Sequence, residues 1–329
     1  MSYFFPSQTI TLEAALRDLA SGSPKSRAMA AHALGDVTDP VEKRRAVDAL
    51  VRALDDDRAD VRMEACAALG ELRDVAAVPA LIKRLDDGAE PVRQHAAIAL
   101  GTLRHPDGFE PLATALREGP ADLRFQAATS IAEIDPIRAF DIVLAALADR
   151  DVQVVSAAAL SLGAIGSSDD ARRARAVAAL ANRLDHANPS TRFDVAYALA
   201  ELGDGSGREV LSAMLGDVDR AWDAVSALAE LRAADELARA LESKQTPPEA
   251  RVLAAGKLCE LRGDAAARAV LLDALTSRKG HVRALAVEQL GDVGGPWAKA
   301  PLEKLARSAK GSDFLEAIAA ALRQIEARA

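Results

Sequence analysis

The residues that most often bind metal ions are few and widely separated in this sequence. The five histidines are His32, His95, His105, His186 and His281. They form no His-x-His or His-Glu-x-x-His motif and no His-Glu dipeptide, so no spacing places two ligands side by side on one helix. We therefore expect no metal site.

Nucleophilic and nucleotide-dependent chemistry has equally little support. The two cysteines, Cys66 and Cys259, lie far apart, and we expect free thiols in a reducing compartment. The phosphate-binding patterns GxxxxGK and GxGxxG and the hydrolase pattern GxSxG do not occur. The sequence therefore indicates no catalytic residue and no cofactor.

The overall charge argues against nucleic acid as a partner. The chain has 41 Lys and Arg and 49 Asp and Glu, a net charge of −8 at pH 7, whereas polyanions are bound by clustered basic residues. The first residues, MSYFFPSQ, have no positively charged region before an apolar run, and no stretch reaches the ~18 apolar residues of a membrane span. We expect a soluble, cytoplasmic protein that binds no nucleic acid.

One short pattern returns ten times along the chain. It reads DVRMEACAALGEL at 60–72, PVRQHAAIALGTL at 91–103 and HVRALAVEQLGDV at 281–293. Alignment on its arginine gives the column Arg27, Arg62, Arg93, Arg124, Val155, Arg192, Ala221, Arg251, Arg283 and Leu315. A pattern repeated this often is more typical of architecture than of a catalytic site.

A second amphipathic segment precedes each copy of this pattern. Examples are AVDALVRALDD at 46–56 and AVPALIKRLDD at 77–87. Their leucines and alanines recur at intervals of three, four and seven residues, which predicts a helix. Each repeat is therefore expected to be a helix A, a turn and a helix B.

Helix B has the composition of a closely packed helix. In the second repeat one helical face holds Val61, Ala65, Ala68, Leu69 and Leu72. Small residues on this face allow neighbouring helices to approach to the close end of the usual 8–10 Å axis spacing. We expect this face to lie against helix A and the adjacent repeats.

The two segments together resemble the HEAT family, in particular the short bacterial HEAT-like repeats of phycobilisome lyases. The resemblance rests on AVPALI and its acidic turn, followed by the DxxVRxxAAxALGxL pattern, and it covers nearly the whole chain. It implies an all-α fold, a right-handed α-solenoid of about ten repeats forming a single domain over 1–329. Residues 10–329 would hold the repeats, and the last repeat, from about 298, would act as the C-terminal cap.

Residues 1–9 would then be an N-terminal cap segment, in which Tyr3, Phe4 and Phe5 cover the first repeat or instead contact a partner. The resemblance also implies that the arginine column stacks the repeats, by bridging to acidic and backbone groups of the adjacent repeat. The expected stacking residues are Arg27, Arg62, Arg93, Arg124, Arg192, Arg251 and Arg283.

Acidic residues recur on the opposite face of helix B, which we expect to line the concave side of the solenoid. Nine residues after the arginine the repeats hold Asp36, Glu71, Thr102, Glu133, Ala164, Glu201, Glu230, Glu260, Asp292 and Gln324. Lysine and arginine are almost missing from the columns of this face. We interpret the face as a carboxylate ridge that attracts a basic partner. The alternative is an ordinary solvated helix face rich in Glu.

Four aromatic residues fall on the same face in repeats four to seven. They are Phe125, Phe193, Tyr197 and Trp222. If they are exposed, they form a central apolar patch with the acidic rim Glu133, Asp194, Glu201, Asp223 and Glu230, which is the composition of a binding hot spot. The alternative is that each ring packs against a neighbouring helix.

These observations favour a non-enzymatic scaffold, monomeric in solution, in a bacterial-type cytoplasm. Its partner would be another protein with a basic or amphipathic surface or peptide. The alternative is a lyase or chaperone subunit for a bilin or other tetrapyrrole cofactor, since the repeat resembles that family. The iron hydroxylase of this architecture needs repeated His-Glu pairs, and the DNA glycosylases built on such repeats need a basic groove. Neither feature occurs here.

Overall fold

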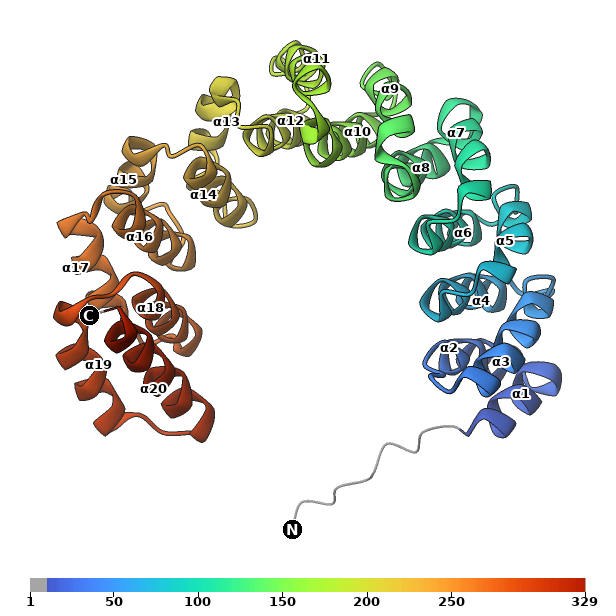
Figure 1. Cartoon of the computed structure of the whole chain (residues 1–329), viewed down its shortest axis with the longest axis horizontal. Helices are drawn as coiled ribbons and strands as arrows, with labels where there is room; N and C mark the ends of the chain where they lie inside the picture. Colours follow the sequence, from blue (N-terminus) through green and yellow to red (C-terminus); the bar gives the residue numbers. More distant parts are fainter. Residues whose placement is uncertain (1–10, 329) are drawn as a thin grey trace. The chain divides into compact units, whose positions relative to one another are not determined.

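The computed structural model describes residues 11–328, apart from the side chain of Ser168 (Figure 1). Within this range the chain forms twenty α-helices, four short 3-10 helices and no strand. The helices pair into ten consecutive hairpins, which confirms the predicted all-α solenoid of helical-hairpin repeats. The expected cap segment with Tyr3, Phe4 and Phe5 lies outside the described residues.

The chain divides into two compact units, Met1–Ala176 and Val177–Ala329, and the boundary falls within one helix, α11. The helices of the first unit are α1 Leu12–Ser21, α2 Pro24–Gly35, α3 Pro40–Ala53, α4 Ala59–Leu72, α5 Val78–Arg84, α6 Glu90–Leu103, α7 Phe109–Glu118, α8 Ala121–Ile134, α9 Pro136–Ala146 and α10 Val152–Ile165. The even-numbered helices are the B helices, and they follow one another in a single layer (Figure 1).

The second unit repeats the same arrangement. Its helices are α11 Asp170–Ala181, which crosses the boundary, α12 Pro189–Glu201, α13 Arg208–Ala213, α14 Ala221–Glu230, α15 Ala234–Glu242, α16 Pro248–Arg262, α17 Ala265–Ala274, α18 Gly280–Val293, α19 Pro296–Ser308 and α20 Ser312–Ala327. The last hairpin therefore begins at Pro296, two residues before the position expected from the sequence. None of the helices described is both long and apolar enough to cross a membrane.

Proline and aspartate set the starts of several A helices. Asp39 accepts hydrogen bonds from the backbone N–H groups of Val41 and Glu42, and Pro40 takes the first helical position. Asp135 and Pro136 begin α9 in the same way. The carboxylate satisfies N–H groups that have no partner inside the helix, while proline has none to satisfy.

Small residues let successive B helices pack closely in the first unit. A Cβ atom on Gly70 would lie 3.2 Å from the Cα and Cβ atoms of Ala99 on the next B helix. A Cβ atom on Gly101 would lie 2.9 Å from the Cβ atom of Ser130. The glycine of the recurring Leu-Gly therefore stands where the next B helix leaves little room for a side chain.

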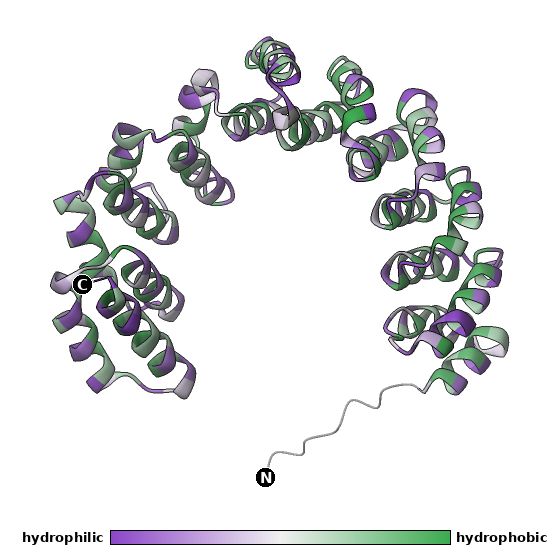
Figure 2. Cartoon of the chain, viewed as in Figure 1, coloured by the Kyte–Doolittle hydropathy of each residue, from purple (hydrophilic) through white to green (hydrophobic). Residues whose placement is uncertain are grey.

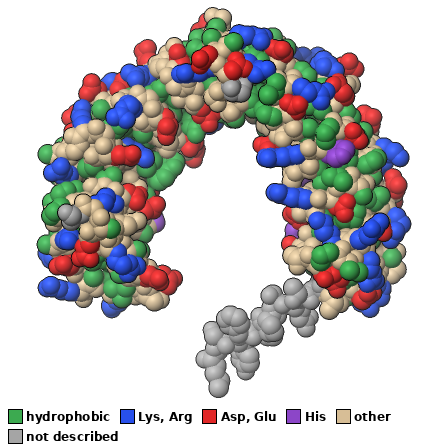
Figure 3. All heavy atoms as spheres, viewed as in Figure 1, with side chains coloured by type: hydrophobic (Ala, Val, Ile, Leu, Met, Phe, Trp, Pro, Cys, Tyr) green, Lys and Arg blue, Asp and Glu red, His purple; other side chains and the backbone are tan. Residues whose placement is uncertain are grey.

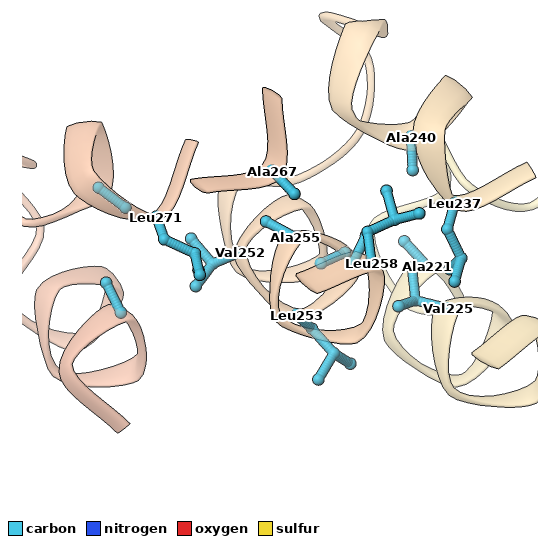
Figure 4. Close-up of a cluster of buried hydrophobic side chains, with 14 of the residues drawn as sticks. Ala221, Val225, Leu237, Ala240, Val252, Leu253, Ala255, Leu258, Ala267 and Leu271 are labelled. Atoms are coloured by element: carbon cyan, nitrogen blue, oxygen red, sulfur yellow. The ribbon is translucent and has the colours of Figure 1, made fainter. Parts of the chain in front are cut away.

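The core of the second unit is made of alanine, valine and leucine. Figure 4 shows Leu258 of α16 directed toward Val225 of α14 and Leu237 of α15. On the other side of α16, Val252 is directed toward Leu271 of α17. Hydrophilic and hydrophobic residues lie on different sides of the helices (Figure 2). Burial of these apolar faces, at about 25 cal/mol per Å², is the main force that holds each hairpin to its neighbours.

Candidate binding surfaces

The nine residues predicted to bind a partner divide between the two units. Phe125 and Glu133 lie on α8 in the first unit. The other seven lie on α12 and α14 of the second unit, two B helices that pack against each other. Each group is therefore described by itself.

The structure corrects the prediction for Phe193 and Asp194. Phe193 is 2% exposed and belongs to the hydrophobic core of the second unit. Asp194 is 7% exposed and accepts a hydrogen bond from Arg220 Nη1 at 3.3 Å. The Arg220 guanidinium also lies over the Phe193 ring, 4.8 Å from its centroid. Neither side chain can serve as an exposed contact for a partner.

Tyr197 lies at the edge of the same core and is influenced by the charges of three carboxylates. The ring is half-buried, and its centroid is 6.3 Å from that of Phe193. Burial raises the pKa of the Tyr197 hydroxyl, and the negative charges of Glu201, Asp223 and Glu230 raise it further. These three acids from α12 and α14 therefore act on one point of the surface.

The three carboxylates are not neutralised by the protein itself. No ion pair within residues 11–328 includes Glu201, Asp223 or Glu230. Glu201 is an exposed residue, yet burial of part of its side chain raises the pKa of its carboxyl group. A carboxylate that has lost water without gaining a cation is well placed to bind a positive group from outside.

Trp222 is an exposed aromatic residue of α14, the helix that also carries Asp223 and Glu230. The side chain is 43% exposed, whereas Ala221 beside it is 1% exposed and faces the core. We use the name acidic aromatic surface for Tyr197, Glu201, Trp222, Asp223 and Glu230. It combines an accessible indole with unneutralised acids, the combination expected of an anchor inside a charged rim.

The B-helix side of the first unit carries basic side chains as well as acidic ones. Arg73 and Arg104 follow α4 and α6 in the left-handed backbone conformation, at φ 50° and 51°. Both line a pocket of about 460 Å³, and Arg104 forms an ion pair with Glu133. Phe125 is half-buried nearby on α8. Lys and Arg side chains stand out from this side of the unit in Figure 3.

The expected carboxylate ridge is therefore interrupted in the first unit. The two arginines follow the last leucine of helix B, a position that does not belong to the columns assigned to this face, so the sequence pattern did not indicate them. The sequence does contain a pattern that could have indicated them, because the same position of the repeat holds Arg232 and Arg262 in the seventh and eighth repeats. Glu133, expected to be free for a partner, is already paired.

The arginine column forms a regular set of contacts in the first unit. Arg62 Nη1 donates to the backbone carbonyl of Asp56 at 2.8 Å, and Nε and Nη2 donate to the Asp87 carboxylate of the next repeat at 2.8 Å. Arg124 binds the Gly119 carbonyl at 2.9 Å and the Asp149 carboxylate at 2.8 Å in the same way. Arg27 pairs with Asp56 and Arg93 with Asp122, each at 2.8 Å.

These contacts change the acidity of the aspartates. Hydrogen bonds from Arg62 and Arg124 hold the pKa values of Asp87 and Asp149 below their usual range. Each arginine thus joins the loop before its own helix to the corresponding loop of the next repeat.

In the second unit the arginines keep only the first half of this pattern. Arg192 donates to the His186 carbonyl at 3.1 Å, Arg251 to the Ser243 carbonyl at 2.6 Å, and Arg283 to the Ser277 carbonyl at 2.6 Å. Among the described residues none of the three forms an ion pair. The bridge to an acid of the next repeat, implied for the whole column, is therefore confined to the first unit.

The cysteines and possible metal ligands carry no reactive arrangement that the structure describes. Both thiols are free, and burial raises the pKa of Cys66 to about 12 and that of Cys259 to about 11. Such thiols stay protonated at neutral pH and are weak nucleophiles. Within residues 11–328 no three His, Cys, Asp or Glu side chains come together as a metal site.

The fold and the repeated loop contacts define a class of protein, the α-solenoids built from helical hairpins. Sequence comparison gives the family. A model of HEAT repeats matches residues 11–101 and 234–323, together more than half of the chain, and a model of the PBS lyase HEAT-like repeat matches residues 92–118. The chain belongs to the HEAT-repeat family. A search of curated proteins found no match.

Several solved structures are similar. Yeast importin-β aligns with a TM-score of 0.64 at 12% identity, covering 99% of this chain and 51% of its own length. The CpcE–CpcF complex of phycocyanin lyase from Nostoc sp. PCC7120 aligns at 0.41 and 24% identity, covering 82% of this chain and 97% of its own. Human deoxyhypusine hydroxylase aligns at 0.36 and 19% identity, covering 86% and 95%. At 12% identity the likeness to importin-β concerns the fold alone.

Proposed function

We propose that this protein is a non-enzymatic scaffold that binds a basic or amphipathic segment of another protein on the acidic aromatic surface. The observation that carries the proposal is the set of three carboxylates, Glu201, Asp223 and Glu230, which form no ion pair within residues 11–328 and whose charges act on Tyr197. One of the two helices that hold them, α14, also carries the exposed Trp222. HEAT-repeat architecture is compatible with this role because stacked B helices present side chains in regular rows.

The two kinds of side chain have different parts in binding. The carboxylates attract a Lys or Arg side chain over several ångströms and speed association. The Trp222 indole supplies contact area and can hold a cation against its face. Tyr197, whose ring centroid lies 6.3 Å from that of Phe193, adds a second ring, and its hydroxyl group can form a hydrogen bond with a polar group of the partner.

A defined probe tests this proposal before a natural partner is known. The probe is a synthetic amphipathic peptide with a repeating Leu-Lys-Lys-Leu sequence, titrated into the full chain by calorimetry. Trp222→Ala should weaken binding at least about tenfold, because truncation of a hot-spot aromatic costs about 2 kcal/mol and 1.4 kcal/mol is one decade. Val218→Ala, which trims another exposed side chain of the second unit, is the matched control. Equal binding by the wild type and Trp222→Ala would refute the proposed anchor.

The second candidate function is a subunit of a bilin lyase or tetrapyrrole chaperone. The match of residues 92–118 to the PBS lyase HEAT-like repeat is the observation in its favour. A titration of the protein with a linear tetrapyrrole, followed by visible absorbance, distinguishes the two. A changed pigment spectrum would support this candidate, and an unchanged spectrum would remove it.

A further inference from the structure

Arg283, the arginine of the ninth repeat, has no acidic partner among the described residues and lines a pocket instead. Its Nη1 atom donates to the Ser277 carbonyl at 2.6 Å. Within residues 11–328 the guanidinium has no other hydrogen bond and no ion pair. A pocket of about 430 Å³ adjoins it in the second unit.

The first unit shows what usually occupies this place. The carboxylates that bind Arg62 and Arg124 belong to Asp87 and Asp149, each six residues before the arginine position of the following repeat. In the tenth repeat the arginine position is Leu315, and the residue six positions before it is Ala309. A methyl group therefore stands where the internal pattern has a carboxylate.

The helical context of Ala309 matches that of Asp87. Both are the third residue before a B helix, α20 at Ser312–Ala327 and α6 at Glu90–Leu103. The Arg283 guanidinium thus keeps Nε and Nη2 free, the two atoms that in Arg62 hold the aspartate.

The lining of the pocket suits an anion. It contains two cationic side chains, three hydroxyl groups and two apolar side chains: Arg283, Lys310, Thr276, Ser277, Ser308, Leu305 and Phe314, with Ala309. None of these residues is acidic. The nearest acid in sequence, Asp313, accepts a hydrogen bond from the Ser312 hydroxyl at 2.9 Å.

We infer that this pocket binds a carboxylate side chain from an acidic segment of a partner protein. The carboxylate takes two parallel hydrogen bonds from Nε and Nη2 of Arg283, as Asp87 does from Arg62, and Lys310 adds a second positive charge. A planar guanidinium fits a carboxylate in this paired geometry better than a single ammonium group does. Leu305 and Phe314 offer an apolar wall for the residue next to the acid.

This site is independent of the proposed function. It selects the opposite charge from the acidic aromatic surface, and it uses residues of α18, α19 and α20 rather than α12 and α14. Arg251 does not offer the same opportunity, because its Nη2 atom already donates to two carbonyls, of Ser243 and Thr246, at 2.6 and 3.1 Å.

The test uses the full chain and the peptide Ac-LDDGAE-NH2, the aspartate loop that binds Arg62 in this protein. The control peptide is Ac-LNNGAQ-NH2, and binding is followed through the side-chain N–H signal of Arg283 by NMR and by calorimetry. Arg283→Gln should weaken binding of the acidic peptide about tenfold, and Lys310→Gln about threefold. Lys304→Gln, which removes the same charge from the neighbouring groove on α19, should leave binding unchanged.

A gain-of-contact variant keeps the proposal falsifiable if Arg283→Gln unfolds the protein. Ala309→Asp should restore the internal pair, raise the melting temperature and abolish peptide binding. Equal binding of the two peptides, an equal loss in Lys304→Gln, or undiminished binding by Ala309→Asp would each overturn the inference. Acetate binding as tightly as the peptide would overturn the assignment to a protein segment.

Discussion

Arg62 holds Asp87 of the following repeat by two hydrogen bonds of 2.8 Å, from Nε and Nη2 to the two carboxylate oxygens. The side chains are only 16% and 4% exposed. Water therefore screens this pair less than a surface ion pair, and loss of either partner leaves a shielded charge alone. The same arrangement at Arg124 makes it a recurrent junction of the first unit.

Removal of the arginine should loosen one junction without melting the helices. We expect Arg62→Ala to lower the free energy of unfolding by about 2 kcal/mol, since hydrogen bonds to charged groups contribute about 1.5–3 kcal/mol. Thermal melts followed by circular dichroism measure the change, and the helical signal at low temperature should stay constant. Arg251 has no carboxylate partner, so Arg251→Ala should lower the free energy of unfolding by less. Equal losses would show that the carboxylate is not the stabilising contact.

The same pairs predict acid sensitivity. Hydrogen bonds from arginine lower the folded-state pKa of Asp87 and Asp149 below the ordinary 3.8. The unfolded chain then binds more protons, so this stability is present above about pH 4 and is lost as the pH falls through the lower folded-state pKa. Urea unfolding between pH 5 and pH 2 measures it. Asp87→Asn should flatten the pH dependence, and an unchanged slope would contradict the assignment.

The burial of Phe193 separates core from surface among the aromatic residues. Phe193→Ala should destabilise the second unit by about 3–5 kcal/mol because the ring leaves a cavity. Trp222→Ala should cost about 1 kcal/mol or less, as for most exposed positions. Denaturant unfolding curves of the two variants provide the measurement. A larger loss in Trp222→Ala would place the indole in the core and remove it as an anchor.

The acids of the acidic aromatic surface should control the rate of association. Glu201→Lys combined with Glu230→Lys should slow association of the basic amphipathic peptide and flatten its dependence on salt, with little change in dissociation. Surface-plasmon kinetics at several ionic strengths measure both rates. The double variant Glu209→Lys and Glu242→Lys changes the net charge equally on A helices. An identical slowing there would reveal a general charge effect.

Glu201 should also show a trade-off between binding and stability. Burial raises its folded-state pKa, so the stability linked to its protonation is present below the ordinary 4.5 and is lost as the pH rises through the raised value. At neutral pH the ionised carboxylate is therefore unfavourable for folding. Glu201→Gln should raise the melting temperature at pH 7 and should weaken binding of the basic peptide. A lower melting temperature would show that Glu201 has a stabilising partner.

The repeated hairpins could be predicted from the sequence because they depend on local periodicity. Leucine and alanine at helical intervals mark which face of each segment is apolar, and proline and aspartate mark where several helices begin. The small residues of helix B predicted close helix packing, and the close approach of Gly70 to Ala99 of the next B helix is its structural counterpart. All these features lie within one repeat or its immediate neighbour.

The charge and exposure of the surface residues depended on contacts between repeats, which a pattern within one repeat does not show. Phe193 shares its helical position with Trp222, yet Arg220 of the next repeat covers the Phe193 ring while the indole stays open. Glu133 is neutralised by Arg104, an arginine from the preceding repeat. Charge and exposure at a helix face are set by side chains that arrive from other repeats. The tertiary structure therefore decided which residues are available to a partner, whereas the sequence by itself determined the helices that carry them.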